Sequence, residues 1–112
     1  MRKDVVVMAA TAALALVFSV EGTLRLARID FHILRFAVWG YPAWAAWAVA
    51  IGQILGAVLL LWPRTFAAGA WLLAAISAGF VVTHLASGDG RVVLVPLAML
   101  AGLAGLALAR RA

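Results

Sequence analysis

The chain has 112 residues, of which 68% are hydrophobic and 12% are charged, and it contains no cysteine. Soluble domains carry about 45–50% apolar and about 25% charged residues, so a water-soluble fold is excluded, as are disulfides, thiolate catalysis and Cys-ligated metal sites. The net charge of +5 comes from scattered arginines and short terminal pairs, which is typical of membrane flanks, and we expect no nucleic-acid partner.

The first apolar run covers Val5–Leu24. It is long enough to cross a bilayer, which needs roughly 20 apolar residues, and we predict a helix over about residues 5–27. Met1-Arg2-Lys3 resembles the basic start of a secretory signal, but no small-x-small cleavage motif follows the run. We therefore expect a retained transmembrane helix.

This run ends in ionisable residues. Glu21 and Arg25 are four residues apart, so they share one helical face, and Arg28 completes it. One interpretation is a local ion pair, which is common on helices. The other is a site, with Glu21 facing the bundle interior and held by Arg25 or His84, because ionisable residues in membranes usually face inward and often mark function.

A short amphipathic segment, Ile29–Val38, follows. Ile29, Ile33 and Phe36 recur at helical spacing, while His32 lies off that stripe. The spacing predicts a short interfacial helix, either lying across the end of the bundle or acting as a lid over a pocket. We expect His32 to be solvated.

The second and third apolar runs are Ala43–Trp62 and Ala67–Leu85, and we predict helices over about residues 42–62 and 66–85. Gln53 stands between Gly52 and Gly56, a Gly-x-x-x-Gly spacing that permits close helix approach, so it is either interhelical glue or pocket lining. His84, near the end of the third run, is an interhelical hydrogen-bond donor, part of a ligand or proton site, or a metal or haem ligand.

The fourth run, Val92–Ala109, predicts a helix over about residues 92–110, which has small residues suited only to packing. Period-2 alternation is absent, so a barrel is disfavoured. We therefore predict an all-α integral membrane protein: one transmembrane domain over residues 1–112, built as a four-transmembrane-helix antiparallel bundle with both termini on one side. The terminus side carries five cations against four on the other, so the positive-inside rule favours cytoplasmic termini.

Helix geometry places the polar residues in depth. At 1.5 Å per residue, Glu21 lies roughly 24 Å along the first helix and His84 lies roughly 25 Å along the third. Gln53 lies nearer the midplane. We therefore expect Glu21 and His84 to approach within direct or water-bridged contact, and we predict a ligand-binding site of Glu21, Arg25, Gln53 and His84. The body of the ligand would contact Trp44, Trp47 and Phe80.

No complete catalytic set is recognisable, so the catalytic residues and any activity stay undetermined. Glu21, Asp30, His32 and His84 have no fixed ligand spacing, so we predict no metal site. We expect no resident cofactor, although a quinone or a lipid-like molecule is a candidate ligand.

The second and third runs resemble the DoxX-like family of small bacterial four-helix membrane proteins. The resemblance covers most of the chain and is carried by Gly40-Tyr41-Pro42, Gln53, Leu55-Gly56-Ala57, Pro63-Arg64 and Thr83-His84, with Phe18 and Gly22 similar in the first run. Many members have an acidic residue where this chain has Gln53. The resemblance implies four helices in a bacterial inner membrane and a link with membrane-associated redox systems, including a quinone-reducing complex.

Three functions remain open. The first is an accessory or anchor subunit of a membrane complex, associated with redox chemistry, which the small-residue faces and the lack of a catalytic set favour. The second is a binding protein or enzyme for an apolar molecule with a polar head, such as a quinone. The third is a transporter-like homo-oligomer, which is disfavoured because the polar residues gather at one end and form no continuous path. The expected partners are the lipid bilayer and either further copies or partner subunits.

Overall fold

The computed structural model describes residues 2–88 and 93–111, and every secondary-structure element in these ranges is a helix. The helices are α1 (Arg2–Ala27), α2 (Ile29–Val38), α3 (Ala43–Leu60), α4 (Phe66–Ala86) and α5 (Leu94–Arg111). The all-helical prediction is confirmed for this part of the chain. The last helix was expected from residue 92, which lies outside the described residues.

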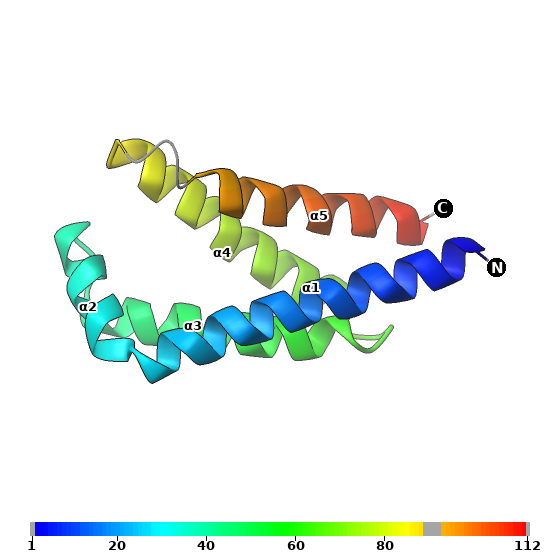
Figure 1. The fold of residues 1–112 in the computed structure, drawn as a ribbon, viewed down its shortest axis with the longest axis horizontal. Coiled ribbons are helices and arrows are strands. Elements are labelled where there is room, and N and C mark those ends of the chain that lie inside the picture. Colours follow the sequence, from blue (N-terminus) through cyan, green and yellow to red (C-terminus); the bar gives the residue numbers. More distant parts are fainter. Residues whose placement is uncertain (1, 89–92, 112) are drawn as a thin grey trace.

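The long helices α1, α3, α4 and α5 follow the long axis of the molecule and alternate in direction, so both termini lie at the same end (Figure 1). The principal extents are 47 × 25 × 18 Å. Helix α2 lies at the other end, where the chain turns from α1 into α3. It covers the predicted residues, and its Phe36 is buried, as the apolar stripe indicates.

Glycines let the helices approach one another closely. A Cβ on Gly22 of α1 would lie 2.8 Å from the carbonyl oxygen of Ala50 in α3, and a Cβ on Gly69 of α4 would lie 2.7 Å from that of Gly56 in α3. The backbones therefore touch where a larger residue would hold them apart, which is the way membrane helices gain packing energy without a hydrophobic driving force. These contacts bring α1 and α4 against the two sides of α3.

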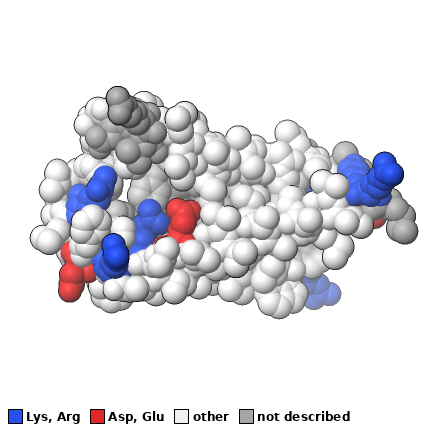
Figure 2. Space-filling view, viewed as in Figure 1, with Lys and Arg blue, Asp and Glu red and all other residues white. Residues whose placement is uncertain are grey.

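Among residues 2–88 and 93–111, three helices are long and apolar enough to cross a membrane: α1, α3 and α4. The apolar stretch of α5, Leu94–Arg110, is shorter than these three. Large apolar side chains such as Met8, Leu16 and Trp71 lie on the outer surface. Figure 2 shows charged side chains gathered towards the two ends of this face, with an uncharged band between them. The chain is therefore a membrane protein whose helices contact lipid.

Candidate functional site

The four side chains that the sequence singles out line one cavity. Glu21 and Arg25 come from α1, Gln53 from α3 and His84 from α4, and the cavity has a volume of about 180 Å³. Its remaining wall is apolar except for one hydroxyl, and it consists of Phe18, Ser77, Phe80, Val95, Pro96 and Met99. We call this space the polar cavity. A few convergent polar groups in an otherwise apolar wall are the usual form of a small-molecule site.

Arg25 connects the polar side chains of this cavity. Its Nη1 donates a hydrogen bond of 2.7 Å to Oε1 of Gln53 and lies 3.8 Å from Oε2 of Glu21. The Glu21 contact is the local pair that the spacing of four residues allows. The Gln53 contact joins α1 to α3, so Gln53, which is 2% exposed, both binds helices together and lines the cavity. The two interpretations of Gln53 are thus compatible.

Two polar atoms of residues that line the polar cavity have no hydrogen-bond partner among the described residues. Nε of Arg25 and Nδ1 of His84 are buried and make no hydrogen bond within the described residues. Buried polar atoms are paired in the great majority of cases, and an unpaired one costs about 1–3 kcal/mol. The residues that line the cavity therefore have hydrogen-bonding capacity that the described part of the chain does not use.

Aromatic rings fix the position of His84. Trp39 and His84 form a T-shaped pair with ring centres 5.3 Å apart, and Phe80 stacks on His84 at 6.1 Å with 18° between the ring planes. Arg25 lies on Phe80, with its Cζ 4.7 Å from the ring centre. Phe80 thus contacts both Arg25 and His84, the first as a cation–π contact and the second as a ring stack.

Of the expected direct or water-bridged contact between Glu21 and His84, the direct form is not made within the described residues. Both residues line the polar cavity, but no hydrogen bond or ion pair joins them within the described residues, and Glu21 pairs with Arg25 instead. Of the three aromatics expected to contact a ligand, only Phe80 lines this cavity. Trp44 and Trp47 are exposed, because they lie on the face of α3 that the other helices leave open.

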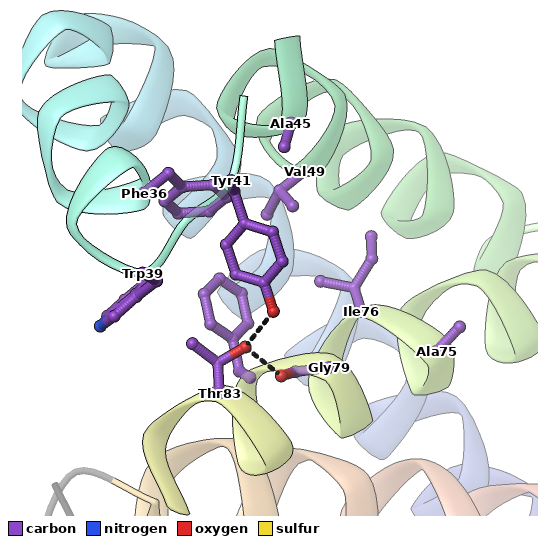
Figure 3. Close-up of a pocket in the computed structure, with 10 residues that line it drawn as sticks. Phe36, Trp39, Tyr41, Ala45, Val49, Ala75, Ile76, Gly79 and Thr83 are labelled. Atoms are coloured by element: carbon purple, nitrogen blue, oxygen red, sulfur yellow. Dashed lines mark hydrogen bonds between the residues drawn. The ribbon is translucent and has the colours of Figure 1, made fainter. Parts of the chain in front are cut away.

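A second cavity of about 240 Å³ lies beside the first and shares Phe80 with it. Figure 3 shows Tyr41 pointing across it to Thr83, with Oη and Oγ1 at 2.8 Å. Oγ1 of Thr83 donates to the carbonyl oxygen of Gly79 at 2.8 Å, so the Tyr41 hydroxyl is the donor to Thr83. Sequence reasoning missed this aromatic wall, although the cluster of aromatics around Gly40-Tyr41-Pro42 is a visible signal for it.

His32 lies outside the polar cavity, in α2. Partial burial lowers its pKa, and the positive charges of Arg25, Arg35 and Arg28 lower the pKa further. Within residues 2–88 and 93–111, no three His, Cys, Asp or Glu side chains come close enough to hold a metal ion.

The sequence of the chain matches a known protein family. The model of the DoxX-like family matches residues 9–106, which include α2, α3, α4 and all four polar residues of the cavity. No curated protein and no solved structure matches the chain. Since the match extends over far more than half of its length, the chain belongs to the DoxX-like family.

Proposed function

We propose that this membrane protein binds an apolar molecule with a hydrogen-bonding head, of the quinone class, and that the head occupies the polar cavity. The observation that carries this proposal is the convergence of Glu21, Arg25, Gln53 and His84 on one cavity, where Nε of Arg25 and Nδ1 of His84 have no hydrogen-bond partner among the described residues. A ligand carbonyl would satisfy the Nε–H of Arg25, and a second polar group would pair with Nδ1 of His84.

The size of the cavity restricts the head. A cavity of about 150 Å³ holds one benzene molecule, so about 180 Å³ admits one six-membered ring with small substituents. An apolar tail would have to leave between the helices. Phe80 and Phe18 supply flat apolar walls, and offset stacking is favourable for a ring placed against them. A planar head with two acceptor atoms fits this combination better than a branched or strongly hydrated one.

A titration with a short-chain quinone tests the proposal. Trp39 and His84 form a T-shaped pair, so Trp39 fluorescence should be quenched when the quinone binds, and a Trp39→Phe variant identifies that part of the signal. Arg25→Met should weaken binding about tenfold or more, since a hydrogen bond to a charged group is worth about 1.5–3 kcal/mol. Arg28→Met is the matched control, because Arg28 is exposed and outside the cavity wall. Equal affinities for both variants would overturn the proposal.

A second candidate function is an accessory or anchor subunit of a membrane complex, with the redox association that the family resemblance implies. It is supported by an exposed face of α5 consisting of Ala101, Gly105 and Leu108, where a Cβ on Gly105 would meet nothing within 4 Å. Small exposed residues permit close approach of another helix, from a partner subunit or from a second copy. Gly105→Trp should then release a co-purifying chain, whereas Ala68→Trp on the exposed surface of α4 should not.

For the topology, we propose four transmembrane helices in a bacterial inner membrane, with both termini cytoplasmic. Although α5 is shorter than the three candidate spans, the 17 residues of Leu94–Arg110 reach the lower end of the spanning range, and the alternating helix directions fit four crossings (Figure 1). The chain lacks cysteine, so Arg2→Cys and Arg111→Cys provide single labelling sites. Both should be labelled from the same side of inverted vesicles; labelling from opposite sides would overturn the topology.

A further inference from the structure

A third cavity, separate from the polar cavity, lies between α4 and α5 near the end that holds both termini. It has a volume of about 480 Å³ and is lined by Phe66, Ala67, Ala70, Trp71, Ala74, Leu100, Leu103, Ala104, Ala107 and Arg110. We call it the outer groove. Alanines at helical spacing produce it, because a side chain that ends at Cβ leaves space that Leu or Ile would fill. Ala67, Trp71 and Ala104 are exposed, so the groove faces the surroundings of the protein.

The length of the outer groove matches one leaflet of a bilayer. Its wall extends from Phe66 to Ala74 on α4, about 12 Å, and from Leu100 to Arg110 on α5, about 15 Å, at 1.5 Å per residue. Half of the hydrocarbon core is about 15 Å thick. Arg110 and Phe66 lie at the helix ends, where the headgroups begin, and Ala74 and Leu100 lie towards the midplane. The groove thus has one charged end and one apolar end.

The charge at the headgroup end is positive. Cζ of Arg110 lies 4.0 Å from the centre of the Phe66 ring, so the guanidinium is held over the mouth of the groove. Within the described residues the only ion pair joins Glu21 and Arg25, so no carboxylate among them pairs with Arg110. Arg64 precedes α4 at the same end, and Figure 2 shows blue side chains at the end of the molecule that holds both termini. Asp4, in the first turn of α1, is the one acidic side chain among the described residues there.

We propose that the outer groove is a binding site for an anionic phospholipid, with the phosphate on Arg110 and one acyl chain between α4 and α5. The cation–π contact with Phe66 keeps the guanidinium at the rim and leaves its N–H groups for phosphate oxygens, which Arg binds in pairs. A lipid with net negative charge is favoured over a zwitterionic one because the surrounding charge is positive. This proposal is independent of any ligand in the polar cavity.

The test measures lipid retention by the intact protein. Nanodiscs of phosphatidylglycerol and phosphatidylcholine in equal amounts are solubilised in mild detergent, and the lipid that stays bound is counted by native mass spectrometry. Wild-type protein should retain phosphatidylglycerol preferentially. Arg110→Gln should lower the amount of bound phosphatidylglycerol about fivefold, which is the effect of one cation near anionic lipid. Arg110→Lys keeps the charge and should bind nearly as much phosphatidylglycerol as the wild type.

A larger side chain in the outer groove tests whether lipid binding needs the space of the groove as well as the charge of Arg110. Ala104→Leu adds bulk to the groove wall and should remove the bound lipid, whereas Ala98→Leu, on the exposed surface of α5 and outside the groove wall, should not. Both positions are exposed, so neither change disturbs the core. Equal retention of the two lipids, full retention by Arg110→Gln, equal effects of the two leucines, or a protein chain found in the groove would each overturn the proposal.

Discussion

Arg25 and Gln53 form a hydrogen bond of 2.7 Å between α1 and α3, with Nη1 as the donor and Oε1 as the acceptor. The bond links an ionisable residue near the end of a membrane-spanning helix to a buried amide on its neighbour. The bond holds α1 and α3 in register. It also sets the position of the Arg25 guanidinium in the polar cavity.

Gln53→Leu should destabilise the bundle by about 1.5–3 kcal/mol, since the buried guanidinium of Arg25 would lose its hydrogen-bond acceptor on α3. Gln53→Glu keeps an acceptor oxygen at this place and should cost less. Unfolding in detergent micelles, followed by circular dichroism, measures both variants. A leucine variant as stable as the wild type would show that the bond contributes nothing.

Gly22→Ala should destabilise the protein by about 1–3 kcal/mol. The new Cβ would lie 2.7 Å from Cγ1 of Ile54 and 2.8 Å from the carbonyl oxygen of Ala50, and the backbone oxygen cannot move without separating α1 from α3. Gly105→Ala is the matched control, because its Cβ would meet nothing within 4 Å. It should be neutral or stabilise by up to about 1 kcal/mol through helix propensity. Similar melting temperatures for the two variants would contradict this packing.

Tyr41→Phe should cost about 0.5–1.5 kcal/mol, because it removes the hydrogen bond that Tyr41 donates to Thr83. Thr83 keeps its own bond to the carbonyl oxygen of Gly79, so the loss should be confined to the segment joining α2 to α3. Hydrogen exchange measured by mass spectrometry should be faster in α2 and unchanged in α5. Unchanged exchange in α2 would mean that this bond does not hold the segment in place.

His32 should make stability depend on pH. Its pKa is lowered in the folded protein, so the unfolded chain binds a proton first as the pH falls through the ordinary histidine value of about 6.5. The contribution of His32 is therefore complete above that pH and decreases below it, by a small amount because the side chain is only partly buried. Melting temperatures at pH 8 and pH 5 should differ less for His32→Gln than for the wild type. An equal or larger difference in the variant would contradict this sign.

Much of the architecture follows from sequence patterns that depend on local physics. The apolar runs and their breakers predict helices close to α1, α3 and α4, and the stripe of Ile29, Ile33 and Phe36 predicts α2. Helix α5 is harder to assign as a span, because its apolar stretch is at the shortest useful length. Whether α5 crosses the membrane depends on the thickness of the surrounding bilayer, and the local sequence pattern carries no information about that thickness.

The grouping of the polar residues was predictable from depth alone, but their contacts were not. Rise per residue brings Glu21 and His84 to one level, and both line the polar cavity. Depth does not fix rotation about the helix axis, so it missed the bond from Arg25 to Gln53 and the place of Phe80 against both Arg25 and His84. The exposure of Trp44 and Trp47 was missed for the same reason, since a membrane helix is apolar on every side.

Binding of a small molecule at the polar cavity is tested most directly by what the purified protein carries. Wild-type protein and the variants His84→Ala and His32→Ala are purified in mild detergent from the same membranes, and their apolar small molecules are extracted and quantified by mass spectrometry. His84 lines the cavity and His32 does not. A comparison of His84→Ala with His32→Ala therefore distinguishes damage to the cavity from the general effect of removing a histidine. The account predicts a ring-bearing amphiphile in wild type and His32→Ala that is absent from a folded His84→Ala. Equal amounts of the same molecule in all three proteins would contradict it.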